Sequence, residues 1–92
     1  MKYLKIQNQV NIGILEIDIH GMTKYQAKIC IDNQLNKAKG NLYRIIVIHG
    51  YHNGTELKDM VHKDYSSHQK VIRVESGLNP GITNLILREL LS

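Results

Sequence analysis

The pentapeptide Ile-x-Ile-His-Gly occurs twice in this chain, at residues 17–21 and 46–50. Each copy ends an apolar stretch with an imidazole and a glycine, and a threonine follows within a few residues, at Thr23 and Thr55. Because threonine often precedes the first turn of a helix, each copy is typical of a strand, a turn and a helix start. Open α/β sheets bind ligands at the carboxyl ends of their strands, and helix N-termini suit phosphate. The repeat therefore predicts a phosphate-handling site at one edge of a sheet.

Three side chains of the repeat are suited to acid/base chemistry. Asp18 and His20 are two residues apart on one strand, which places their Cα atoms roughly 6.6 Å apart on one face, and His49 ends the other strand. We expect His20, oriented by Asp18, to act as general base and His49 as general acid or electrophile, with both imidazoles outside the core. The alternative is a histidine that only hydrogen-bonds a turn carbonyl. The repetition of the pentapeptide favours catalysis.

The glycine-containing loop after the second copy adds groups that can contact a phosphate or a base. Backbone amides of such loops converge on phosphate oxygens, and an aromatic loop residue can stack on a base, although glycine-rich turns are also common as plain connectors. The candidate nucleic-acid- and phosphate-binding residues are Gly21, Gly50, Tyr51, His52, Gly54, Lys24, Lys28, Lys58, Lys63 and Arg73.

Metal and cofactor sites have little support in the sequence. His20, His49 and His52 lack a nearby Cys pair or a His-Glu-x-x-His spacing, so a structural zinc site is not expected. We predict no cofactor and no metal ligands, with a divalent ion such as Mg²⁺, held by Asp18 and Glu16 or another carboxylate, as the alternative.

The composition indicates one globular domain of 92 residues. No apolar run reaches membrane-spanning length and the beginning lacks a secretory signal, so we expect a cytoplasmic protein without a membrane partner. The single Cys30 is expected to be a core thiol. The net charge is +4, and residues 24–44 carry five cations against Asp32, a surplus that equals this excess. That segment is either a solvated helix face or a phosphate-contacting face.

The apolar periodicity predicts the elements that position these groups. Leu15, Ile17 and Ile19 should face inward from the first strand, and the run 45–48 suggests a central strand covered on both faces. We predict strand 14–20, a helix begun by Thr23 and ended by Gly40, strand 45–48 after Arg44, a helix capped by Thr55, strand 71–74, a turn at 79–81 and strand 82–87. This order gives an α/β two-layer sandwich, β-α-β-α-β-β, with a mixed four-stranded sheet. Residues 1–13 are expected to form an arm or edge strand, and 14–92 a single domain.

Three segments together resemble the Smr (small MutS-related) domain family. Residues 18–21, Asp-Ile-His-Gly, resemble its Leu-Asp-Leu-His-Gly motif, residues 49–54 resemble its His-Gly-x-Gly-x-Gly loop, and residues 79–83 resemble the turn before its final strand. The resemblance implies a fold similar to the C-terminal domain of a bacterial translation initiation factor. It also implies nucleic-acid binding and, in several members, endonuclease activity.

The family motifs fall on Asp18, His20, His49, Gly50 and Gly54, whereas the middle glycine of the loop is replaced by His52. We predict a nucleic-acid-binding endonuclease, acting on RNA more than on DNA. A non-catalytic nucleic-acid- or ribosome-binding module on the same surface is the first alternative, and a small-molecule phosphate binder the second. Because no carboxylate cluster for two metal ions is evident, the substrate's own 2′-hydroxyl is the expected nucleophile.

Overall fold

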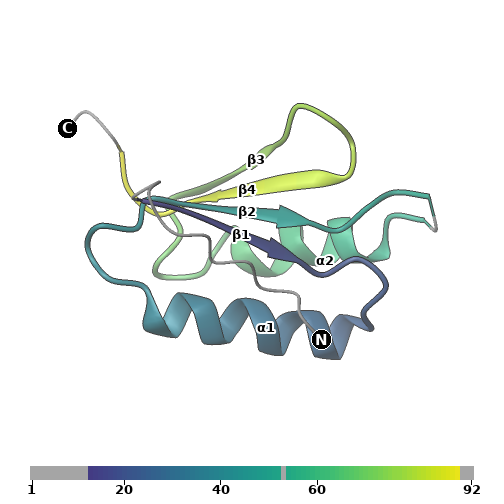
Figure 1. Cartoon of the computed structure of the whole chain (residues 1–92), viewed down its shortest axis with the longest axis horizontal. Helices are drawn as coiled ribbons and strands as arrows, with labels where there is room; N and C mark the ends of the chain where they lie inside the picture. Colours follow the sequence, from purple (N-terminus) through teal and green to yellow (C-terminus); the bar gives the residue numbers. More distant parts are fainter. Residues whose placement is uncertain (1–12, 53, 90–92) are drawn as a thin grey trace.

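The order of helices and strands in the computed structural model, which describes residues 13–52 and 54–89, is the predicted one. The elements are β1 (Ile14–Asp18), α1 (Lys24–Lys37), β2 (Arg44–Ile48), α2 (Glu56–Tyr65), β3 (Arg73–Ser76) and β4 (Ile82–Ile86) (Figure 1). The expected arm or edge strand at residues 1–13 lies outside the described residues, apart from Gly13. The chain therefore forms the predicted α/β sandwich with a mixed four-stranded sheet.

The sheet has the strand order β1-β2-β4-β3, and its pairing brings three chain segments to one edge. β1 and β2 are parallel, with Asp18 opposite Ile48, so both His-Gly turns leave the sheet at the same edge. β4 runs antiparallel to β2 and begins with Ile82 opposite Ile48. The turn before β4 consequently joins the two His-Gly turns. The start of β2, the end of β4 and the start of β3 lie at the opposite edge.

Both helices lie on one face of the sheet, and the core lies between these two layers (Figure 1). Ile17 and Ile19 are buried as expected, and Leu15 is partly buried against the core. β2 is central, but only the side chains that face the helices are buried in it. Ile45 and Val47 are inaccessible, whereas Ile46 and Ile48, on the other face, remain partly exposed. The expectation that both faces of this strand are fully covered is therefore wrong.

The two helices begin in different ways. At α1, the Gln26 amide donates to Thr23 Oγ1 at 3.1 Å and the Thr23 amide donates to Gln26 Oε1 at 3.0 Å, which is the predicted capping box. Thr55 also precedes its helix, but its hydroxyl donates to the Asp59 carboxylate at 2.9 Å and caps no backbone amide. The predicted cap at Thr55 is wrong because a carboxylate one turn into α2 engages the hydroxyl instead.

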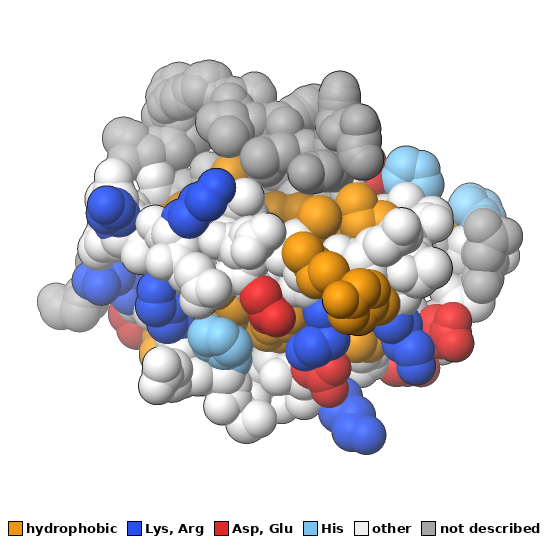
Figure 2. Space-filling model, turned by 90° about the horizontal axis from the view of Figure 1, so that it is seen from below, with side chains coloured by type: hydrophobic (Ala, Val, Ile, Leu, Met, Phe, Trp, Pro, Cys, Tyr) orange, Lys and Arg blue, Asp and Glu red, His pale blue; other side chains and the backbone are white. Residues whose placement is uncertain are grey.

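The other departures from the expected elements are small. α1 ends at Lys37, before Gly40, and the third strand begins at Arg73, two residues after the buried Val71. Cys30 is partly buried and its thiol lies 3.9 Å from the sulfur of Met22; burial raises the pKa of this thiol. Seen from the helix side, the surface mixes basic, acidic and hydrophobic side chains (Figure 2). It carries no extended field of one sign.

Candidate nucleic-acid site

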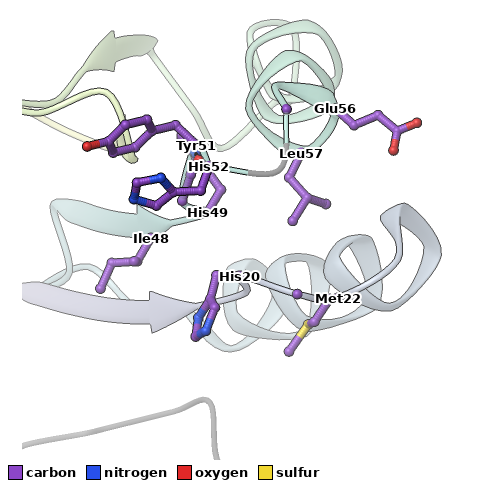
Figure 3. Close-up of a pocket in the computed structure, with 11 residues that line it drawn as sticks. His20, Met22, Ile48, His49, Tyr51, His52, Glu56 and Leu57 are labelled. Carbon is purple, nitrogen blue, oxygen red and sulfur yellow. Dashed lines mark hydrogen bonds between the residues drawn. The ribbon is translucent and has the colours of Figure 1, made fainter.

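The two His-Gly turns are side by side, as the parallel pairing of β1 and β2 requires. The Ile19 amide donates to the Ile48 carbonyl at 2.8 Å, which extends the pairing one residue beyond β1. Gly50 has a φ of +77°, and a Cβ placed on it would lie 3.5 Å from Cβ of His20. Around this junction lies a hollow of about 430 Å³ (Figure 3), lined by His20, Gly21, Met22, Ile48, His49, Gly50, Tyr51, His52, Gly54, Glu56 and Leu57. The structure thus brings together the predicted residues of both turns.

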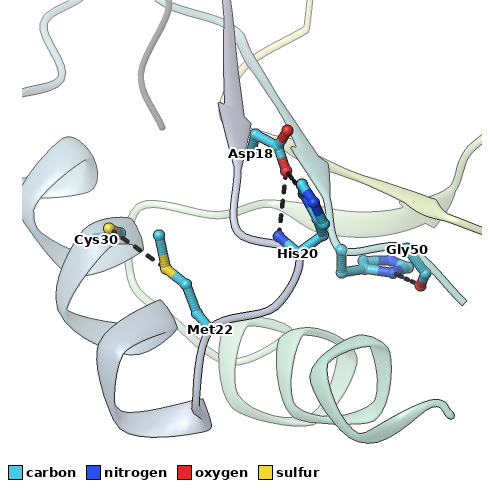
Figure 4. A network of polar contacts seen from close by, with 6 residues as sticks. Asp18, His20, Met22, Cys30 and Gly50 are labelled. Atoms are coloured by element: carbon cyan, nitrogen blue, oxygen red, sulfur yellow. Dashed lines mark hydrogen bonds and ion pairs between the residues drawn. The ribbon is translucent and has the colours of Figure 1, made fainter. Parts of the chain in front are cut away.

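Asp18 and His20 form an exposed, oriented pair at the margin of this hollow. His20 Nδ1 lies 2.6 Å from Asp18 Oδ1, and the same oxygen accepts the His20 backbone amide at 3.1 Å (Figure 4). The hydrogen bond to Asp18 and its negative charge raise the pKa of His20. Since the carboxylate can only accept, Nδ1 holds a proton and Nε2 is the nitrogen that takes up or releases one. In the part of the chain that the structure describes, no group hydrogen-bonds this Nε2.

His49 lies in the core, contrary to the expectation that both imidazoles lie outside it. Its side chain is 5% exposed, and both ring nitrogens have partners. Nδ1 is 2.9 Å from the Gly50 carbonyl oxygen, and Nε2 is 2.8 Å from Thr83 Oγ1. The same hydroxyl oxygen is 3.1 Å from Nε2 of His62, on α2. The contact between His49 Nδ1 and the Gly50 carbonyl matches the alternative stated above, a histidine that hydrogen-bonds a turn carbonyl and takes no part in catalysis.

The directions of these hydrogen bonds follow from the Gly50 carbonyl, the one group in this hydrogen-bonded series that can only accept. A carbonyl only accepts, so His49 Nδ1 donates to Gly50 and His49 Nε2 is an acceptor. The Thr83 hydroxyl must then donate to His49, which leaves its oxygen to accept from His62 Nε2. Burial lowers the pKa of His49; the hydrogen bond to Gly50 opposes this shift, and electrostatic interaction with Lys58 and His62 adds to it. His49 is therefore held neutral, in one tautomer, with no free nitrogen for a substrate.

The sequence analysis missed Thr83 and His62 as site residues. Thr83 is fully buried, and it lies within the segment 79–83 that was recognised only as a turn. The signal available in the sequence was a threonine, Thr83, shortly after the turn at 79–81, together with a histidine, His62, next to the apolar positions of α2. The partners of Thr83, His49 and His62, are 34 and 21 residues away from it, too far for a local sequence pattern to connect them.

The turn before β4 holds the glycine loop in place. The amides of His49 and Gly50 both donate to the Gly81 carbonyl, at 2.9 and 3.0 Å. A Cβ on Gly81 would lie 3.2 Å from Cδ1 of Tyr51 and 3.3 Å from Cα of Gly50, so the two segments are in close contact and a side chain there would crowd the loop. Because the Gly50 amide is already paired, the amides available to a phosphate lie further along the loop.

The predicted cations fall into three places. Lys24, Lys28 and Lys63 surround a second hollow between α1 and α2, where Glu56, Asp59 and Asp64 also lie. Lys28 pairs with Asp64 at 3.5 Å and its ammonium lies 5.0 Å from the centre of the Tyr65 ring. Lys58 lies close enough to His49 to lower the pKa of that ring.

Arg73 is not part of this site. It starts β3 opposite Ile86, which pairs in turn with Arg44 at the far edge of the sheet. Its guanidinium is paired with Glu75 and Glu89. The sheet register carries Arg73 to the edge opposite the His-Gly turns, so the structure does not bring it together with the predicted residues of those turns.

In residues 13–52 and 54–89, no three His, Cys, Asp or Glu side chains are grouped so that they could hold a metal ion. Neither of the helices in these ranges is long and apolar enough to cross a membrane.

Fold and site together define a small α/β domain with paired His-Gly turns and a hollow at one edge of its sheet. The family model of the Smr domain matches residues 17–80, and the chain belongs to this family. The structure is also similar to the Smr domain of MutS2 from Thermus thermophilus, with a TM-score of 0.72 and 22% sequence identity over 80% of this chain and 98% of that chain. At this identity the similarity shows the fold alone. No curated protein sequence matches the chain significantly. Smr domains are associated with nucleic-acid binding and nuclease activity.

Proposed function

We propose that this Smr domain is an endonuclease that cleaves phosphodiester bonds within RNA in preference to DNA. The observation that carries the proposal is the exposed Asp18–His20 pair beside the hollow. One carboxylate oxygen fixes the ring through two contacts and stabilises its protonated form. The other ring nitrogen has no hydrogen-bond partner among the described residues, and the side chain is 68% exposed, so a substrate can reach it. This is the arrangement that general acid/base catalysis requires.

In the proposed reaction, His20 Nε2 takes the proton of the substrate's 2′-hydroxyl, and the resulting oxygen attacks the adjacent phosphorus. The bond to the 5′-oxygen breaks, and that oxygen takes a proton from solvent. Asp18 stabilises the imidazolium that forms. Lys58 and the loop amides beyond Gly50 meet the negative charge on the phosphate. We assign His49 to holding the Gly50 turn, because its nitrogens are both occupied and its pKa is lowered.

The test is a cleavage assay on end-labelled RNA and DNA of one sequence, with and without a chelator. We expect RNA to be cut in both conditions, leaving a 2′,3′-cyclic phosphate and a 5′-hydroxyl. A substrate with 2′-deoxyribose at the scissile position should remain intact. Products with 5′-phosphate ends, or cleavage that stops on chelation, would overturn the 2′-hydroxyl mechanism. Intact RNA and DNA after exhaustive incubation would overturn the nuclease assignment.

A non-catalytic nucleic-acid- or ribosome-binding module is the second candidate. It is favoured by His52, whose exposed side chain stands where the family loop has its middle glycine. That bulk restricts how closely a phosphate approaches the loop. The same cleavage assay separates the two candidates, since this module would bind nucleic acid and leave it intact.

Binding should weaken as salt is added, because each lysine that neutralises a phosphate releases counterions. We expect Lys58→Gln to make the slope of log affinity against log salt shallower by about 0.7 to 0.9. Lys39→Gln is the matched control, since Lys39 is an exposed lysine beyond the end of α1, at the opposite end of the domain. Titrations at several salt concentrations measure both slopes. Equal slopes in the two variants would remove Lys58 from the phosphate contacts, and an affinity indifferent to salt would favour a small-molecule ligand.

A further inference from the structure

We propose that the rings of Tyr51 and His52 form a stacking platform for an unpaired base, so that the hollow accepts single-stranded nucleic acid and rejects a closed duplex. The inference rests on the proposed nucleic-acid binding, but it does not need cleavage. The two rings are stacked on each other, with centroids 4.5 Å apart and planes 25° apart. Both residues are exposed, Tyr51 by 49%. Figure 3 shows the two rings together at one side of the hollow, with His20 on the strand end below them.

The platform is fixed from behind by the turn before β4. Tyr51 packs closely against Gly81, since a Cβ on Gly81 would lie 3.2 Å from Cδ1 of the Tyr51 ring. The Gly81 carbonyl accepts the amides of both His49 and Gly50, and so holds the loop residues just before Tyr51. The buried chain from His62 through Thr83 to His49 holds the same turn from the core side. An aromatic pair that is already ordered loses less conformational entropy when a base stacks on it.

The lining of the hollow suits a base better than a backbone phosphate. Besides the aromatic rings it includes Met22, Ile48 and Leu57, which offer no hydrogen bond to a charged group. Apolar walls and an aromatic face favour the flat, weakly polar surface of a nucleobase. Inside a duplex that surface is covered by neighbouring bases, so an enzyme or binder reaches it only in single strands, loops or flipped nucleotides. A base held here would bring its own sugar and phosphate to the margin where Asp18 and His20 lie.

The hollow between the helices is the weaker candidate for the same strand. It holds Lys24, Lys28 and Lys63, but Glu56, Asp59 and Asp64 line it as well. One of these lysines is already paired with a carboxylate. Its cations therefore do not give the uncompensated positive surface that a nucleic-acid backbone favours.

The experiment uses an RNA oligonucleotide of about 12 nucleotides, within the length that a stacking groove covers, carrying one 2-aminopurine. We expect the single strand to bind more tightly than its duplex by at least about tenfold, with 2-aminopurine fluorescence quenched on binding. Tyr51→Ala should weaken single-strand binding by about 5- to 150-fold, the range that follows from the loss of one stacking contact. Tyr51→Phe should bind like the parent, because the ring rather than the hydroxyl carries the contact.

Two further variants test the pair and its location. His52→Gly replaces the second ring of the pair by the glycine of the family loop, and we expect it to lose quenching as Tyr51→Ala does. Tyr25→Ala is the matched control, since Tyr25 is a tyrosine 75% exposed on α1 and outside this hollow; its affinity should be unchanged. If Tyr51→Ala and His52→Gly bind single strands like the parent, the platform is overturned. It is also overturned if a duplex binds as tightly as its separate strands. Either result leaves nucleic-acid binding in place. A parent chain that binds neither form would instead overturn the proposed function.

Discussion

His20→Ala should lower the rate of RNA cleavage by about 10²- to 10⁴-fold, the usual contribution of a positioned general base. The folded state should be unaffected, because the His20 side chain is 68% exposed and its ring is paired only with Asp18 among the described residues. Single-turnover cleavage measures the rate, and thermal melting of the same preparation measures the fold. His68→Ala is the matched control, since His68 follows α2 at the other end of the domain.

The Asp18→Asn variant tests whether His20 acts as a general base or merely binds substrate. A general base works in its deprotonated form, so the rate should rise with pH through the pKa of His20. Asp18 raises that pKa, and replacing it with a neutral amide should move the rise to lower pH. A pH profile that stays in place in Asp18→Asn, or full activity in His20→Ala, would remove the pair from the catalytic step.

The fold was predictable because its signals are local. Alternation along β1 placed Ile17 and Ile19 inward, and Thr23 with Gln26 marked the start of α1. The repeated pentapeptide, read as two parallel strands, placed both His-Gly turns at one edge, and the register of β1 against β2 confirms it. The strand alternation and the helix start need only neighbours within about one turn of helix or a few residues of strand, and the repeat itself supplied the pairing of β1 with β2.

The roles of the two histidines were not predictable from the shared Ile-x-Ile-His-Gly pattern, because the two copies sit on the sheet with opposite faces inward. In β1 the two isoleucines of the motif point to the helices, so His20 points away from them. In β2 Ile45 and Val47 point to the helices, and His49, two residues further, follows them into the core. When the positions that face the core are shifted by one residue along a strand, its buried and exposed side chains change places. The same sequence motif therefore yields one exposed imidazole and one buried one.

Long-range contacts account for the rest of the differences. Thr83 and His62 reach His49 because β4 pairs with β2 and α2 packs on β4. Arg73 is basic in the sequence like the lysines near the site, but the antiparallel pairing of β3 with β4 sends it to the far edge. Charge and residue type identify candidates for a phosphate contact. The sheet register decides which of them share a site.

Thr83→Val should destabilise the domain by about 2 kcal/mol, an effect that follows from the buried chain of hydrogen bonds. Valine has almost the shape of threonine, so the packing is kept while the hydroxyl is lost. His49 Nε2 then has no donor and His62 Nε2 no acceptor, and the first of these nitrogens belongs to a side chain that is 5% exposed. A group left unpaired in the core costs about 1–3 kcal/mol, which for a chain of this length lowers the melting temperature by about 4–8 °C per kcal/mol.

Thr83→Ser is the matched control for this prediction, because it keeps the hydroxyl and removes only a methyl group. If the hydroxyl carries the stability, the serine variant should unfold at a higher urea concentration than the valine variant, although the serine side chain is the smaller of the two. Filling of the core alone predicts the reverse order, since valine buries more apolar surface. The order of the two unfolding midpoints thus decides whether His49 is held by Thr83 or simply packed beside it, and with it whether His49 is a residue that positions the Gly50 turn.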